Sequence, residues 1–97
     1  MKCSSLEEVR ANIDRIDDSI IKLMAERAEY VRQAAEFKKD ESGVKAPDRV
    51  KAVLVRVGEK ARKYGAPPDI AVMVYKNMIE GFIGLEMDKF SSERSKP

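Results

Sequence analysis

The segment 6–37, LEEVRANIDRIDDSIIKLMAERAEYVRQAAEF, decides the fold, because its apolar residues recur every three or four positions. That spacing is typical of one stripe along an amphipathic helix that faces a core. The stripe consists of Leu6, Val9, Ile13, Ile16, Ile20, Leu23, Arg27, Tyr30, Ala34 and Phe37. Arg27 brings a charge into it, and Lys38 follows one step past its end. A buried cation needs an anion beside it, from the protein or from a ligand, and the rest of the chain favours a ligand.

The first helix is expected to span about 5–39, because this stretch contains neither proline nor glycine. Ser5 and Glu8 stand three residues apart at its start, which is the pattern of a capping box. At ~1.5 Å per residue the helix would be about 50 Å long. A compact domain of this size has a radius of gyration of only about 13 Å. The helix would therefore extend beyond any core that one chain can build, and we expect a second subunit to cover its far end.

Two shorter helices are expected to follow, so the sequence predicts an all-α protein with a single domain over residues 1–97. Pro47 near a helix start and Gly65 after a helix end mark two of the boundaries. The predicted elements are helices at about 5–39, 48–64 and 68–91, a polar loop at 40–46 and a disordered tail at 92–97. Glu86 interrupts the apolar stripe of the last helix, much as Arg27 interrupts that of the first.

The composition excludes several classes of function. The 97 residues include 19 basic and 17 acidic ones, and a net charge of +2 is too balanced for binding to nucleic acid or a membrane surface. The sequence has no histidine and one cysteine, Cys3, so it offers no candidates for a metal cluster or for a Ser/His or Cys/His nucleophile. It also has no apolar run typical of a bilayer span or a signal peptide, so we expect a cytoplasmic protein.

Helical spacing constrains which cations can share a ligand. Arg27 and Lys38 are eleven residues apart, which on one helix places them on the same face, about 16 Å apart along the axis. Arg10 precedes Arg27 by seventeen residues, which corresponds to roughly 25 Å and about 100° around the helix. Arg10 and Arg27 of one helix therefore cannot easily grip the same small molecule. In an antiparallel pair of long helices, Arg10 of one chain could reach the site that holds Arg27 of the other.

Three motifs carry a resemblance to a known family: VRANIDRID at 9–17, LMAERAEYV at 23–31 and AAEFKK at 34–39. With two shorter helices after them, they make residues 5–91 resemble the all-helical chorismate mutases and the related isochorismate pyruvate lyases. The resemblance implies an intertwined homodimer with two equivalent sites, a small dicarboxylate substrate and no cofactor. That dimer agrees with the overlong first helix.

The resemblance also implies a role for each matched residue. Arg27 would bind one carboxylate of the substrate, and Arg10 of the partner subunit would bind the other. Lys38 and Glu86 would face the ether oxygen of the breaking C–O bond. The other matched positions, around the substrate, are Arg49 at the start of the second helix and the apolar walls Val53 and Ile83.

The implied reaction is the rearrangement of chorismate to prephenate, and two residues bear on the choice between this and the lyase reaction. Many mutases have an acid directly after the arginine of the second helix, whereas this chain has Val50, which is similar to the lyases. Glu86 stands where the lyase pattern has glutamine, and is similar to certain mutases. Only a protonated Glu86 can donate to an ether oxygen, so we expect activity to fall as pH rises through its titration. A helical dimer that senses a metabolite or acts as a scaffold without turnover is the non-enzymatic alternative.

Overall fold

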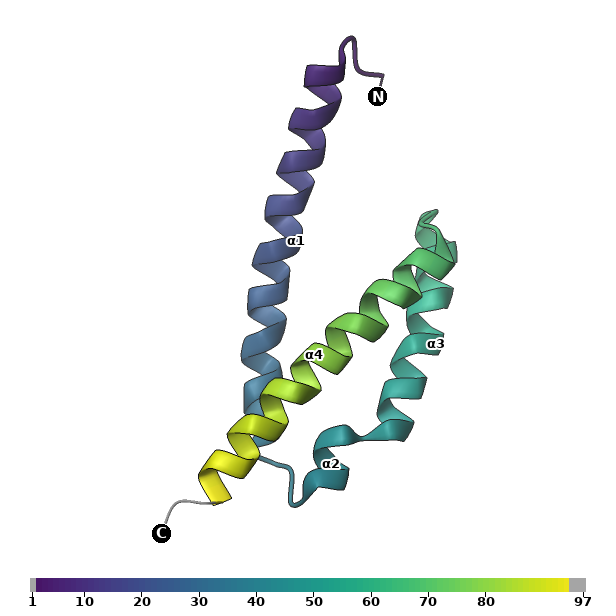
Figure 1. Ribbon diagram of the computed structural model, residues 1–97. Coiled ribbons are helices and arrows are strands. Elements are labelled where there is room, and N and C mark those ends of the chain that lie inside the picture. The colour runs from purple at the N-terminus through teal and green to yellow at the C-terminus, as the bar shows by residue number, and fades with distance from the viewer. Residues whose placement is uncertain (1, 95–97) are drawn as a thin grey trace. The chain divides into compact units, whose positions relative to one another are not determined.

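A computed structural model describes residues 2–94, with side chains through Asp88. The elements are four helices, α1 (Leu6–Ala35), α2 (Glu41–Lys45), α3 (Pro47–Tyr64) and α4 (Pro68–Arg94) (Figure 1). The described residues contain no strand, which confirms the all-α prediction. The chain forms two compact units, Met1–Tyr30 and Val31–Pro97. The assignment of residues 1–97 to one domain stays a prediction.

Helix α1 begins where the sequence predicts. The Ser5 hydroxyl accepts a hydrogen bond from the Glu8 N–H at 3.1 Å, which is one half of the capping box. The Glu8 carboxylate accepts from the Ser4 N–H at 3.0 Å and from the Ser4 hydroxyl at 2.8 Å, in place of the Ser5 N–H that a complete box would use. The backbone bond from Ser4, followed by the bond from its hydroxyl, holds the pKa of Glu8 below its ordinary value.

The predicted end of the first helix at residue 39 is wrong, because α1 ends at Ala35. Its last carbonyls are taken by short-range bonds, from Phe37 N–H to the Ala34 carbonyl at 3.0 Å and from Lys38 N–H to the Ala35 carbonyl at 3.2 Å. Bonds of this i to i+3 type tighten and end a helix. Lys38 therefore lies on the connector to α2, and the predicted alignment of Arg27 and Lys38 along one helix face does not exist.

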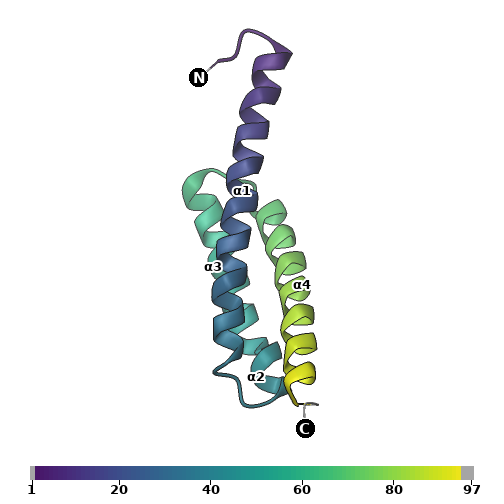
Figure 2. The same cartoon turned by 90° about the vertical axis from the view of Figure 1, so that its left-hand side faces the viewer.

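Helix α2 is a short element inside the predicted loop 40–46. Asp40 is its N-cap, and the Asp40 carboxylate accepts from the Gly43 N–H at 2.8 Å. Val44 is 2% exposed and belongs to the small core of the second unit. Figures 1 and 2 show α2 beside the later part of α4. This buried valine explains how a five-residue helix keeps its place.

Helices α3 and α4 are antiparallel neighbours, and both views show them side by side (Figures 1 and 2). Gly58 is buried in α3, where an added Cβ would lie 3.6 Å from Val72 Cγ2 of α4. Gly65 ends α3 in a left-handed conformation at φ 77°, as the sequence predicts. Helix α4 continues to Arg94, so its predicted end at 91 is three residues short. The predicted tail 92–97 is thus helical at 92–94, and 95–97 lie outside the described residues.

The apolar stripe of α1 is exposed in the single chain. No residue of α1 is buried, and Ile13 and Leu23 are 50% and 63% exposed. A helix with this pattern normally gains its stability by burying the apolar face. The second subunit that would cover it stays a prediction.

Candidate active site

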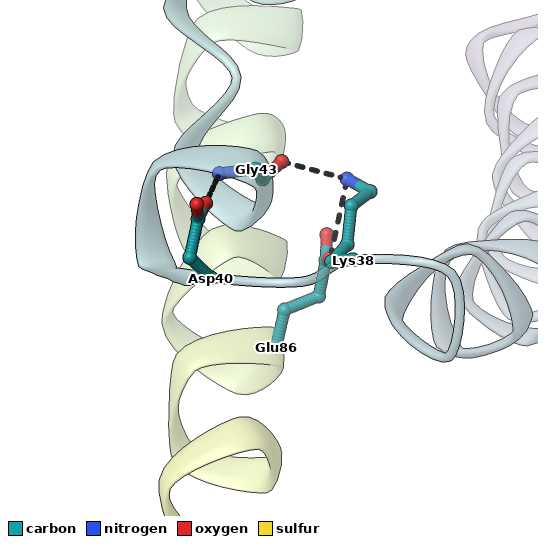
Figure 3. Close-up of polar contacts among 4 residues, drawn as sticks. All are labelled: Lys38, Asp40, Gly43 and Glu86. Atoms are coloured by element: carbon teal, nitrogen blue, oxygen red, sulfur yellow. Dashed lines mark hydrogen bonds and ion pairs between the residues drawn. The ribbon is translucent and has the colours of Figure 1, made fainter.

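Lys38 and Glu86 meet in the second unit, although they are far apart in sequence (Figure 3). The Lys38 ammonium lies 3.8 Å from Glu86 Oε2, which is ion-pair distance but too long for a hydrogen bond. The same ammonium donates to the Gly43 carbonyl at 3.0 Å. A connector residue and a residue of α4 thus converge on one point, and their roles toward a substrate stay predictions.

This pair is shielded from water without being fully buried. The side chains of Lys38 and Glu86 are 26% and 11% exposed, and Glu86 Oε2 itself is buried. Partial burial strengthens electrostatic interactions relative to those on an open surface. An ammonium has three N–H donors, and the Gly43 carbonyl takes one of them. The pair therefore has the features of a charged donor site for a polar atom of a ligand.

Helix α3 presents Arg49 and Val53 from its first turns. Arg49 is exposed and Val53 is half-buried. The start of this helix is set by Ala46, which caps both α2 and α3 in a left-handed conformation at φ 37° and ψ 60°. A residue with a Cβ rarely adopts that conformation, so the junction between the two helices stores strain. Pro47 then occupies the first helical position, where its missing N–H is no loss.

Ile83 lies on α4 three residues before Glu86, and it is half-buried. Residues three apart on a helix are neighbours on one face. Ile83 thus supplies an apolar side chain on the helix face that carries the carboxylate. The role of Ile83 as an apolar wall of a substrate pocket stays a prediction.

Arg10 and Arg27 belong to the first unit, on α1. Arg10 is exposed, whereas Arg27 is half-buried despite its place on the amphipathic stripe. Because both lie within one unbroken helix, their separation of roughly 25 Å along the axis holds. Their roles toward a substrate stay predictions.

The sequence did not reveal the roles of Asp40 and Gly43. The Gly43 carbonyl accepts a hydrogen bond from Lys38 Nζ, and the Gly43 N–H donates to the Asp40 carboxylate (Figure 3). The sequence signal for this cap is Asp40 three residues before Gly43, because an N-cap side chain accepts from an N–H of the first helical turn. The short helix α2 was not predicted, because Gly43 within a polar stretch is typical of a loop.

The described residues hold no group of three or more His, Cys, Asp or Glu side chains that could bind a metal ion. Within 2–94, no helix combines the length and the apolar character of a membrane span.

Comparison with known proteins identifies the family. The family model described as chorismate mutase type II matches residues 9–87, a range that includes all seven predicted site residues. An isochorismate pyruvate lyase of Pseudomonas aeruginosa is 29% identical over 95% of this chain and 91% of its own length. A chorismate mutase of Methanocaldococcus jannaschii is 28% identical over 94% of this chain and 93% of its own. A bifunctional chorismate mutase/prephenate dehydratase of Aquifex aeolicus is 31% identical over 84% of this chain but 24% of its own length. This helical chain belongs to the chorismate mutase type II family.

Proposed function

We propose that this protein catalyses the rearrangement of chorismate to prephenate. The observation that carries the proposal is the convergence of the Lys38 ammonium and the Glu86 carboxyl, 3.8 Å apart, in a partly shielded place. In this rearrangement one C–O bond breaks and one C–C bond forms within a single molecule. The reaction needs neither a nucleophile nor an electron carrier. It needs a substrate held in a compact conformer, and donors that stabilise the negative charge growing on the ether oxygen.

Lys38 and Glu86 are suited to the ether oxygen. The Lys38 ammonium keeps N–H donors available beyond the one that the Gly43 carbonyl takes. A protonated Glu86 would add a second donor on the same side. Because both side chains are largely withdrawn from water, their hydrogen bonds to a developing charge are worth more than those of exposed groups.

The two carboxylates of the substrate need cations, which we assign to Arg27 and to Arg10 of the partner subunit. Arginine binds a carboxylate through two parallel hydrogen bonds and fixes its orientation. One α1 helix cannot supply both residues to one small molecule, because they lie roughly 25 Å apart along it. Arg49 would stand at the edge of the pocket, with Val53 and Ile83 as apolar walls.

The active form is then a homodimer in which α1 of each chain contributes to both sites. The exposed apolar stripe of α1 supports this assignment, because Leu6, Ile13 and Leu23 are each at least half exposed in the single chain. A second copy of the same stripe is a suitable cover. Sedimentation analysis of the purified protein should therefore give twice the chain mass.

Elimination of pyruvate from isochorismate, which yields salicylate, is the second candidate. Two observations favour it: the similarity to the Pseudomonas lyase, and Val50 directly after Arg49. Both reactions break an ether C–O bond of a related dicarboxylate, so one cationic pocket could serve either in different poses.

The test offers chorismate and isochorismate separately to the purified protein and identifies the products. Prephenate with little salicylate supports the mutase, whereas efficient salicylate formation replaces it with the lyase. If neither substrate reacts, the enzymatic proposal is wrong, and calorimetric binding of chorismate then separates a sensor from a scaffold.

Arg27→Ala tests the site assignment, with Lys22→Ala as the matched control on the same helix. The Lys22 ammonium forms an ion pair with Asp18 at 3.1 Å, and 77% of the Lys22 side chain is exposed. Arg27→Ala should abolish turnover and leave a folded dimer, while Lys22→Ala should keep the wild-type rate. Near-wild-type kcat/KM in Arg27→Ala would refute the assignment.

A further inference from the structure

Lys38 needs a constraint that α1 does not supply. It lies past the end of the helix, on the connector, and carries a long flexible side chain. A catalytic ammonium has to be held near its productive position, because a displacement of about 1 Å can lower a rate strongly. Besides the longer contact with Glu86, the hydrogen bond from Lys38 Nζ to the Gly43 carbonyl at 3.0 Å supplies such a constraint.

The Gly43 carbonyl is itself held in place. The Gly43 N–H donates to Asp40 Oδ1 at 2.8 Å (Figure 3). Gly43 is thus held by Asp40 through its N–H, and its carbonyl accepts from Lys38. The bond from Asp40 is the N-cap of α2. Removing it would release the first turn of this five-residue helix, which has few internal hydrogen bonds to keep its shape.

We propose that Asp40 is a positioning residue, which caps α2 through the Gly43 N–H and so holds the Gly43 carbonyl where it aims the Lys38 ammonium at Glu86. The catalytic consequence of this arrangement rests on the proposed function. Asp40 is itself exposed and would act through Gly43 and Lys38 without touching the substrate.

The distances around Gly43 show that Asp40 and the aliphatic stem of Lys38 both pack against it. A Cβ added at this position would lie 3.5 Å from Asp40 Oδ1, and 3.6 and 3.7 Å from Lys38 Cβ and Cδ. These are ordinary packing distances, so the Lys38 stem and the Asp40 carboxylate flank the same backbone unit. The arrangement therefore depends on the acceptor atom of Asp40, more than on the absence of a side chain at Gly43.

The first test is kinetic and uses three variants. Asp40→Ala removes the acceptor, Asp40→Asn keeps it without the charge, and Asp69→Ala removes a comparable acid from the first turn of α4. Loss of a cap hydrogen bond lowers the equilibrium constant for forming the helix start by about fivefold, so we expect Asp40→Ala to lower kcat by up to about fivefold. We expect KM to change less, because the ammonium acts mainly on the transition state. Asp40→Asn should stay within about twofold of wild type, and so should Asp69→Ala.

The second test does not depend on turnover. Lysine acetylation by an activated ester, followed by peptide mass spectrometry, compares Lys38 with Lys22, whose side chain is 77% exposed. Lys38 should react more slowly than Lys22 in the wild type and in Asp40→Asn. In Asp40→Ala its rate should rise at least threefold, while Lys22 stays unchanged.

The outcomes separate this inference from the proposed function. If the wild type transforms neither substrate, the proposed function fails, and the acetylation of Lys38 still decides whether Asp40 holds it. Wild-type kcat and an unchanged Lys38 acetylation rate in Asp40→Ala would overturn the inference alone. Equal losses of kcat in Asp40→Ala and Asp40→Asn would also overturn it, because charge rather than capping would then be responsible.

Discussion

The partly shielded pair of Lys38 and Glu86 should stabilise the fold more than a closer pair on the surface does. With the Glu86 carboxyl ionised, at 3.8 Å and an effective dielectric constant of about 20, the two unit charges attract by about 4 kcal/mol. The loss of water around both groups offsets much of this attraction. With side chains 26% and 11% exposed, the pair lies between the surface and buried cases, so we expect a net coupling of about 1–2 kcal/mol.

A double-mutant cycle measures that coupling. Lys38→Met keeps the aliphatic stem, Glu86→Gln keeps the shape, and the double variant completes the cycle. The free energy of unfolding comes from urea titration followed by helical circular dichroism. All variants are compared at one fixed protein concentration, because the stability of an oligomer depends on it.

The matched control is the pair of Asp18 and Lys22, whose charged atoms are closer, at 3.1 Å, but whose side chains are 68% and 77% exposed. Pairs of this kind, four residues apart on a helix, couple by about 0.3–0.5 kcal/mol. We expect burial to outweigh distance, so that the longer pair couples more strongly. Salt at about 0.5 M should screen and so remove the coupling of the surface pair. The expectation is refuted if the Lys38–Glu86 coupling is no larger than that of the surface pair, or if the same salt removes it.

Three further predictions follow from single contacts. Glu86→Gln should keep activity to higher pH than the wild type, because an amide donates a hydrogen bond at any pH. Profiles of rate against pH measure this, and a wild-type profile that is flat from acid to alkaline pH would contradict it. Gly65→Ala should lower the free energy of unfolding by about 1 kcal/mol, because Gly65 has φ 77°. Gly81→Ala, where the added Cβ meets open space within α4, should raise it by about 0.5–1 kcal/mol. Urea titration measures both changes, and equal effects of the two substitutions would contradict this expectation. The lowered pKa of Glu8 stabilises the folded state above about pH 4.5, and this contribution is lost as pH falls through the lowered pKa. The gap in Tm between wild type and Glu8→Gln should therefore shrink on acidification, and a gap independent of pH would argue against the bonds from Ser4.

The three long helices could be predicted from sequence because their signals are local. The apolar period of α1, Pro47 at the start of α3 and Gly65 at its end each act over a few residues. The end of α1 could not be read in this way. Residues 36–39 are compatible with a helix by composition, and the chain leaves it because short-range bonds close the last turn and Asp40 starts a new one.

For the candidate site, the sequence by itself determined the chemistry: cations, one carboxyl, and no histidine or metal-ligand cluster. It also indicated the family through the motifs of α1. The tertiary structure decided that Lys38 leaves the helix, that Glu86 of α4 comes within 3.8 Å of it, and that Gly43 and Asp40 hold it. The physical reason is range. Helix periodicity and capping act between neighbours in sequence, whereas the meeting of residues 38 and 86 depends on how α2, α3 and α4 pack around Val44, Ala61 and Ile79.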